Sequence, residues 1–476
     1  MPRTLAKSSS VLGIRLDGDS PSSFTPGDTI VGCIFRRDQT VSTDGLLTIC
    51  LNGRAKSLIL VSVLNNTTNT YRGRFNLLDT SINTDKIFQG PIHIPKSEEE
   101  QVWPFAIKIP TNVDPTAADP ASQILSRLPA DSESITSGPL PSSFEVETHG
   151  NRSTTMGFVE YFLRAELQLT GQGSVDVSEA LFPIIIQNMH PYPSIVDFKL
   201  QPFISTRSIS SFRLLPGNEK SGPSFSQRTK KLFGSSKVPG LCFNAQVDFP
   251  SVIQIDNPKP IPFTIRLTPD STKCTENIRG ASQKFKLTRI TMKIVAKTQM
   301  FGEGVTRSHE ADTTEELDLD PMGLFDGLDG PIFISCSEKS PRVDIGEILN
   351  LRIGRQGRPG QKSPGTLYPS FRTYNIVHTH SMTWGFGLEL AGENIMIHAS
   401  KPLVILPPSN DKAAASSVPA YSPPAGASKD ASPQQTSDSW ICPPDDGQAP
   451  PSFDQVKEED LARTQFGDDK GKRPSE

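Results

Sequence analysis

Two groups of residues have types and spacing that suggest catalysis, but neither completes a site. The segment GRQGRPGQKS (354–363) resembles a phosphate-binding loop, yet it lacks the glycine-to-lysine spacing of that loop. His378 and His380 alternate on one face of an expected strand and could bind a metal, but no third ligand is near in sequence. We therefore expect a surface histidine pair, no metal or other cofactor, and no enzyme activity.

Residues suited to binding form a row of cations between residues 289 and 297. Period-two alternation predicts a strand with apolar residues on one face, namely Ile290, Met292, Ile294 and Ala296. The opposite face carries Arg289, Lys293 and Lys297. An exposed row of cations attracts acidic peptides, so this face is a candidate binding surface. An ordinary solvated face is the alternative interpretation.

A second basic segment lies in the glycine- and proline-rich stretch 214–240. Arg228, Lys230 and Lys231 stand between Phe225 and Phe233. Cations beside aromatic residues are typical of segments that touch anionic lipid head groups. The segment is a candidate lipid-binding or regulatory loop, and the alternative is a loop with no partner.

The elements that position these residues are expected to be short strands. Alternation points Trp103, Phe105, Ile107 and Ile109 inward, and likewise Leu47, Ile49 and Leu51, which precede an Asn52-Gly53 turn signal. In the segment 157–169, Val159, Tyr161 and Leu163 face inward, while Glu160 and Arg164 face solvent. Long helical periodicity is nearly absent, so we expect an all-β protein built from antiparallel β-sandwiches.

Several stretches interrupt the strands. Residues 115–155, 214–240 and 354–366 are expected to be loops, and the acidic run 310–320 is also expected to be a loop, without the spacing of a calcium-binding site. The segment 182–193 is the expected domain boundary. It separates a domain at 11–190 from a domain at 191–408. Residues 409–476 are rich in proline and serine and are expected to be a disordered tail.

Composition limits the classes of partner. The formal net charge is −4, which predicts no affinity for nucleic acid. Residues 409–476 hold 12 acidic and 7 basic residues, so a nearly neutral body carries an acidic tail. The six cysteines form no CxxC pair, and the first residues lack the apolar core of a signal peptide. We therefore expect a cytoplasmic protein with reduced thiols.

Several segments, in their order along the chain, resemble the arrestin family and in particular the fungal arrestin-related trafficking adaptors. They are FTPGDTIVGCIF (24–35), LTICLNGRAK (47–56), IFQGPIHIP (87–95), WPFAIKIP (103–110), VEYFLRAEL (159–167), KLTRITMKIVAKTQ (286–299) and LELAGENIMIHASKPLVILPP (388–408). The resemblance covers most of residues 11–408. It implies an arrestin fold of two Ig-like antiparallel β-sandwiches joined by a short hinge.

The resemblance also implies a function. Proteins of this type bind the cytosolic tails of plasma-membrane transporters or receptors, and they recruit a HECT-type ubiquitin ligase whose WW domains grip PPxY motifs. Ubiquitination and endocytosis of the cargo follow. The resemblance thus implies an adaptor that is recruited from the cytoplasm to the plasma membrane and endosomes, where peripheral membrane contact is possible.

The tail holds only degenerate versions of the ligase motif. Pro450, Pro451 and Phe453 match PPxY except for the missing hydroxyl, and an unpaired partner for that hydroxyl costs about 1–3 kcal/mol. Pro419 and Tyr421 keep the tyrosine but have one proline. Two weak motifs on one tail gain avidity if the ligase has several WW domains. A proline-rich linker without a partner is the alternative.

Two other functions remain open. One is an arrestin-fold scaffold in signalling or ambient-pH sensing that does not bind a ligase directly. The other is a β-sandwich enzyme acting on carbohydrate, which would need paired carboxylates in a cleft.

Overall fold

The structure is a computed structural model that describes residues 4–9, 11–18, 23–63, 67–79, 83–96, 100–114, 117, 138–170, 175–190, 193–215, 217–218, 238–354 and 367–410. We call the described residues up to His190 the N-terminal half and those from Pro193 the C-terminal half. Both belong to one compact unit, Met1–Val418.

The fold of these residues is all-β. The strands of the N-terminal half are β1 (Gly13–Leu16), β2 (Thr29–Arg36), β3 (Thr40–Ser62), β4 (Thr68–Asn76), β5 (Thr84–Ile94), β6 (Gln101–Lys108), β7 (Phe144–His149), β8 (Ser153–Thr170) and β9 (Val175–Ile184). Those of the C-terminal half are β10 (Leu200–Ser210), β11 (Gly240–Pro250), β12 (Val252–Gln254), β13 (Thr264–Pro269), β14 (Gln283–Glu303), β15 (Ser308–Asp318), β16 (Phe333–Cys336), β17 (Val343–Asp344), β18 (Phe371–Arg372), β19 (Ile376–Leu390) and β20 (Glu393–Leu406).

Helical segments are short and lie in the C-terminal half of the described chain. They are η1 (Phe212–Leu214), η2 (Glu276–Ile278), α4 (Pro321–Asp326) and α5 (Ile345–Ile348). Asp320 caps α4 and Asp344 caps α5, each by accepting a backbone hydrogen bond from the first turn. None of the described helices is long and apolar enough to cross a membrane.

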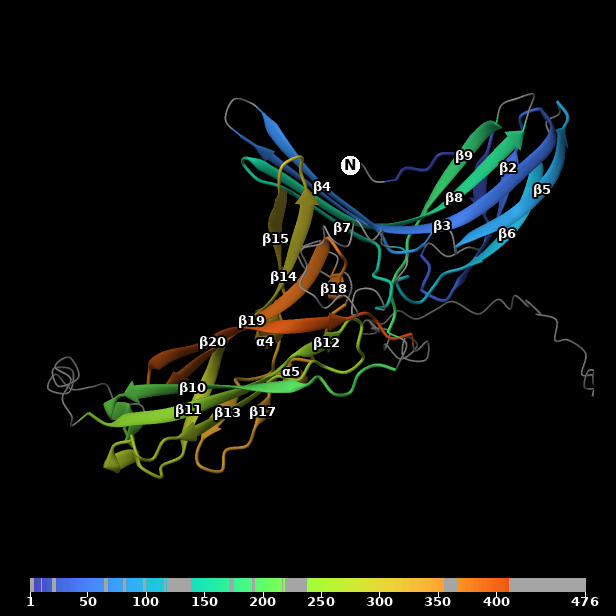
Figure 1. The fold of residues 1–476 in the computed structure, drawn as a ribbon. Coiled ribbons are helices and arrows are strands. Elements are labelled where there is room, and N and C mark those ends of the chain that lie inside the picture. Colours follow the sequence, from blue (N-terminus) through green and yellow to red (C-terminus); the bar gives the residue numbers. More distant parts are fainter. Residues whose placement is uncertain are drawn as a thin grey trace, which may run out of the picture. The chain divides into compact units, whose positions relative to one another are not determined.

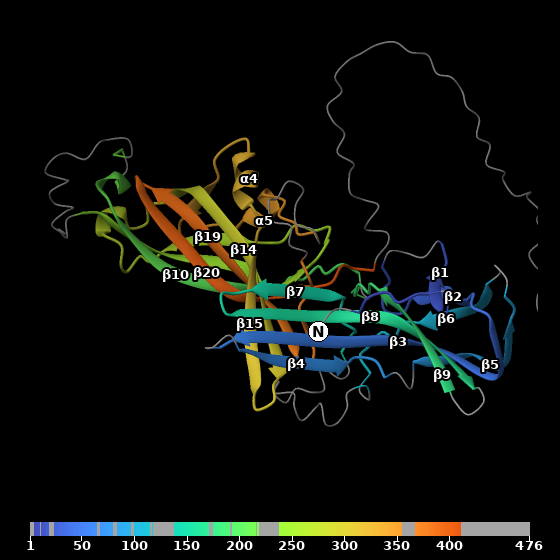
Figure 2. The ribbon, with the colours of Figure 1, turned by 90° about the horizontal axis from the view of Figure 1, so that it is seen from above.

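The N-terminal half has two layers with a hydrophobic core between them. One layer is the antiparallel sheet β1-β2-β6. In the other layer β8 pairs with β3, β7 and β9, while β3 also pairs with β4 and β5; Figure 2 shows β7, β8, β3 and β4 side by side. The predicted inward residues Trp103, Phe105, Ile107 and Ile109 are buried between the layers, which confirms the alternation.

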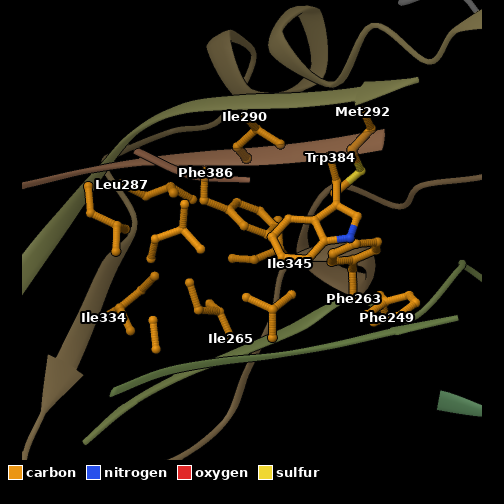
Figure 3. Packing of buried hydrophobic residues seen from close by; sticks show 14 of the residues in the cluster. Phe249, Phe263, Ile265, Leu287, Ile290, Met292, Ile334, Ile345, Trp384 and Phe386 are labelled. Atoms are coloured by element: carbon orange, nitrogen blue, oxygen red, sulfur yellow. The ribbon is translucent and has the colours of Figure 1, made fainter. Parts of the chain in front are cut away.

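The C-terminal half repeats this β-sandwich-like arrangement with its own core. The strands β10, β11 and β13 lie side by side on one face, and β14 pairs with β15 and β19, which pairs with β20 (Figure 1). Trp384 of β19 is 1% exposed and sits at the centre of the core (Figure 3), with its ring 5.6 Å from that of Phe263. Ile265, Phe386 and Leu388 are also fully buried in this core.

Three expected loops or turns are strands. Asn52-Gly53 is not a turn, because β3 continues through it to Ser62. A Cβ on Gly53 would lie 2.7 Å from the Tyr161 ring, so glycine serves close packing there. The end of the loop expected at 115–155 forms β7 and the start of β8, with Phe144 and Val146 buried. The acidic run 310–320 lies largely in β15, an antiparallel neighbour of β14. The remainder of the expected loops falls mostly outside the described residues.

A buried polar contact, which we call the interlock, joins the two halves. Ser57 of β3 donates its hydroxyl hydrogen bond to the carbonyl oxygen of Phe301 in β14, and the Asn375 amide donates to the Ser57 oxygen at 3.0 Å. Asn375 is fully buried, and its main-chain carbonyl oxygen accepts from the Phe301 main-chain N–H at 3.0 Å. A Cβ on Gly73, opposite Ser57 in β4, would lie 2.7 Å from the Phe301 oxygen. Glycine is therefore required at residue 73 for the halves to approach this closely.

Apolar contacts surround the interlock. Met300 and Ile376 of the C-terminal half are buried in the core of the N-terminal half. Phe144 of β7 packs edge-on against Phe371 at a ring distance of 4.9 Å. After β20 the chain returns to the connection between the halves, where the His190 N–H donates to the Pro408 oxygen at 2.7 Å. The halves thus share both polar and apolar buried contacts.

Candidate functional site

The three predicted cations lie on β14, and a bulge determines where they point. The pairing of β14 with β19 shifts register between Leu287 and Arg289. Before the bulge Leu287 faces the core, and after it Ile290 does, so the inward parity changes from odd to even residues. Arg289, Lys293 and Lys297 therefore point outward, as do Lys284 and Lys286 before the bulge. The bulge gathers the outward cations on one side of the strand.

The neighbouring strand β15 neutralises part of this row. The Lys293 ammonium lies 3.0 Å from the Glu316 carboxylate, and the Lys297 ammonium lies 2.7 Å from the Asp312 carboxylate. The hydrogen bond to Glu316 raises the pKa of Lys293. Both pairs are half-exposed, so each contributes little stability and exchanges readily with another anion.

Arg289 has a different environment from the two lysines. It is exposed, and no carboxylate of the described residues lies within ion-pair distance of it. The same holds for Lys284 and Lys286. The unneutralised charge of this surface is therefore concentrated at the bulged start of β14, which alternation alone did not predict.

The histidine pair is buried, so the expectation of a surface pair is wrong. His378 is 4% exposed and His380 is 5% exposed, and their rings meet edge-on at 4.7 Å. Their Nδ1 atoms hydrogen-bond the hydroxyls of Thr298 at 2.8 Å and Ser370 at 2.9 Å. Both Nε2 atoms lack a protein partner. In the described part of the chain, no three His, Cys, Asp or Glu side chains converge as metal ligands would.

Burial also sets the protonation of these histidines. It lowers the pKa of His378 to about 3, with a further contribution from His380, and that of His380 to about 4. His378 packs against Phe144 of the N-terminal half at a ring distance of 5.0 Å. A charge on this pair would therefore be placed directly at the contact between the halves.

A buried ionic group around Glu160 was not predicted from the sequence. Glu160 of β8 was expected to face solvent but is 4% exposed. Its carboxylate accepts from Arg54 at 2.8 Å and from Lys56 at 2.6 Å, and the Thr4 N–H donates to it at 2.8 Å. Burial alone would raise the pKa of Glu160, but these hydrogen bonds outweigh it and lower the pKa to about 2. The flanking Phe158 and Phe162, on the same face as Glu160, were the signal that this face is covered.

The remaining predicted sites cannot be placed. Arg228, Lys230 and Lys231 lie outside the described residues, and so do Pro419, Tyr421, Pro450, Pro451 and Phe453. These assignments stay predictions. Comparison with models of known protein families and with curated proteins gives no match to this chain.

The histidine pair predicts a loss of stability in mild acid. Because the folded pKa values lie below the ordinary value of 6.5, the unfolded chain binds protons that the folded chain does not. Stability is complete above pH 6.5 and falls as the pH drops towards 4. At pH 5 the loss is about 2 kcal/mol per histidine, measurable from urea unfolding at pH 7 and pH 5.

A double variant tests the assignment of this effect. His378→Gln with His380→Gln should lower stability at pH 7 but reduce the difference between pH 7 and pH 5. His398→Gln, at an exposed position of β20, is the matched control and should keep the wild-type difference. An unchanged pH dependence in the double variant would show that other groups cause it.

Proposed function

We propose that this protein is a non-enzymatic, arrestin-like adaptor. It binds the cytosolic tails of plasma-membrane transporters or receptors and brings a WW-domain HECT-type ubiquitin ligase to them, so that the cargo is ubiquitinated and endocytosed. In this proposal residues 11–190 and 191–408 are Ig-like β-sandwiches and residues 409–476 are a disordered tail. The protein resides in the cytoplasm and moves to the plasma membrane and endosomes.

The observation that supports this proposal best is the presence of two separate hydrophobic cores in one compact unit. Each half packs antiparallel strands around its own core, and the halves meet through the interlock. This arrangement agrees with the two-sandwich body that the sequence resemblance implies.

The cargo-binding part of the proposal assigns the cations of β14 to acidic cargo tails. Arg289 provides a charge without a carboxylate partner among the described residues. Lys293 and Lys297 provide charges that form ion pairs with Glu316 and Asp312. Surface ion pairs of this kind are weak, so an acidic tail can displace the β15 carboxylates. The β15 strand thus sets the affinity of the face for cargo.

The ligase-binding part of the proposal places the two degenerate motifs, around Tyr421 and Phe453, in the tail after β20. A WW domain binds an extended proline segment in an aromatic groove, and an adjacent pocket takes the ring of Phe453. The tail begins after Pro408, which pairs with His190 at the connection between the halves.

A binding measurement tests the ligase contact. Titration of the full chain with tandem WW domains from a HECT ligase should give weak binding, which Phe453→Tyr should tighten by about tenfold because the hydroxyl regains its partner. Phe466→Tyr, in the same tail but without preceding prolines, is the matched control. Equal affinity of wild type and Phe453→Tyr would exclude the motif.

In cells, deletion of residues 409–476 should abolish cargo ubiquitination. A scaffold without ligase contact would not depend on the tail.

The β15 carboxylates provide a test of the cargo face. Asp312→Asn with Glu316→Gln frees Lys297 and Lys293, so an oligoglutamate peptide should bind more tightly, and Lys293→Glu with Lys297→Glu should weaken it. Glu310→Gln with Glu315→Gln removes the same charge from β15 without freeing a paired cation, and serves as the control. If both acid-neutralising variants change affinity equally, the effect is one of net charge and the face is not the binding site.

A further inference from the structure

A pocket lies on the outer face of the N-terminal half, between the Thr4–Leu5 segment and strands β3, β4, β8 and β9. Its volume is about 360 Å³, at the small end of ligand-binding cavities. Its charged lining consists of Arg54, Lys56, Arg74, Arg164 and Glu179. Apart from Thr4 and Leu5, the residues that line it come from strands, so the backbone that carries its charges is ordered before any ligand binds.

The cations of this pocket are only partly neutralised. Arg164 and the neighbouring Lys7 are balanced by two carboxylates. The Arg164 guanidinium lies 2.8 Å from Glu166 and 2.7 Å from Glu179, and the Lys7 ammonium lies 3.4 Å from Glu179. Arg54 and Lys56 share the single carboxylate of Glu160. Arg74 forms no ion pair or hydrogen bond with the described residues. Arg54, Lys56, Arg74 and Glu160 therefore leave two positive charges uncompensated.

The strand register makes this arrangement unfavourable without an anion. Lys56 of β3 lies directly opposite Arg74 of β4, and like charges in that position destabilise a sheet. Burial lowers the pKa of Lys56 more than the hydrogen bond with Glu160 raises it, and the neighbouring cations Arg54 and Arg74 add a smaller lowering. Glu160 already accepts from Arg54, Lys56 and Thr4, so it has little capacity left for Arg74.

We propose that Arg54, Lys56 and Arg74 form a binding site for a small, compact dianion of the phosphate or phosphomonoester type. Two uncompensated positive charges match its charge of about −2, and guanidinium groups match its tetrahedral oxygens. The size of the pocket and the Thr4–Leu5 segment over it favour a small ligand. Arg74 supplies a charge that forms no ion pair with a carboxylate of the described residues, although Glu160 attracts it from a greater distance. The site is separate from the cations of β14 and does not depend on the adaptor function.

Titration calorimetry on the full chain tests this site, with inorganic phosphate and O-phospho-L-serine as probes in a non-binding buffer. Both probes should bind. The probe with the higher affinity shows whether the site prefers free phosphate or an esterified phosphate. Arg74→Gln should weaken binding by about tenfold or more, because it removes a charged hydrogen-bond donor. This variant should fold normally, since Arg74 is exposed and has no partner to lose.

The matched control is Arg72→Gln, which removes the same charge from the same exposed face of β4 but does not line the pocket. It should bind phosphate as the wild type does. Equal losses in Arg72→Gln and Arg74→Gln, equal binding in wild type and Arg74→Gln, or tighter binding of succinate than of phosphate would each overturn the proposal. No cargo or ligase enters this experiment, so its failure would leave the adaptor proposal standing.

Discussion

The buried hydrogen bonds among Ser57, Phe301 and Asn375 are the constraint on which the arrangement of the two halves depends. A buried amide or hydroxyl without a partner costs about 1–3 kcal/mol, so the halves cannot separate here without exposing these groups to water or leaving them unpaired. Glycine at residues 73 and 157 leaves room for the two halves to approach each other. A Cβ at Gly157, for example, would lie 2.6 Å from the Met300 sulfur. The interlock therefore fixes the surface strands of one half relative to those of the other. Neither half could form this contact alone.

The strands themselves follow from local pattern, whereas their pairing does not. Alternation identified inward residues of β3 and β6, because one side of each strand meets the core of the N-terminal half. Alternation could not recognise β15. Acidic residues occupy this edge strand, and two of them form ion pairs with Lys293 and Lys297 of the neighbouring strand. The Asn52-Gly53 pair predicts a turn, which is wrong. Glycine at 53 instead leaves room for the Tyr161 ring, and that ring belongs to a strand about a hundred residues away in sequence.

The charged groups show the same division between what sequence predicts and what it cannot. The outward direction of Arg289, Lys293 and Lys297 was predictable, but their carboxylate partners on β15 were not. The burial of Glu160 and of the histidine pair depends on segments that cover them, which sequence spacing does not reveal. Among the described residues, Arg289 on β14 and Arg74 on β4 are cations without a carboxylate partner, one in each half.

The central claim is that the interlock makes the two β-sandwich-like halves one cooperative body. Scanning calorimetry of the full chain and of Gly73→Ala tests it most directly, with Gly330→Ala as a control because a Cβ there meets no atom. We predict one unfolding transition for wild type and Gly330→Ala, and two for Gly73→Ala, in which a Cβ forces Ser57 and Phe301 apart. A single transition at the wild-type temperature in Gly73→Ala would contradict the claim.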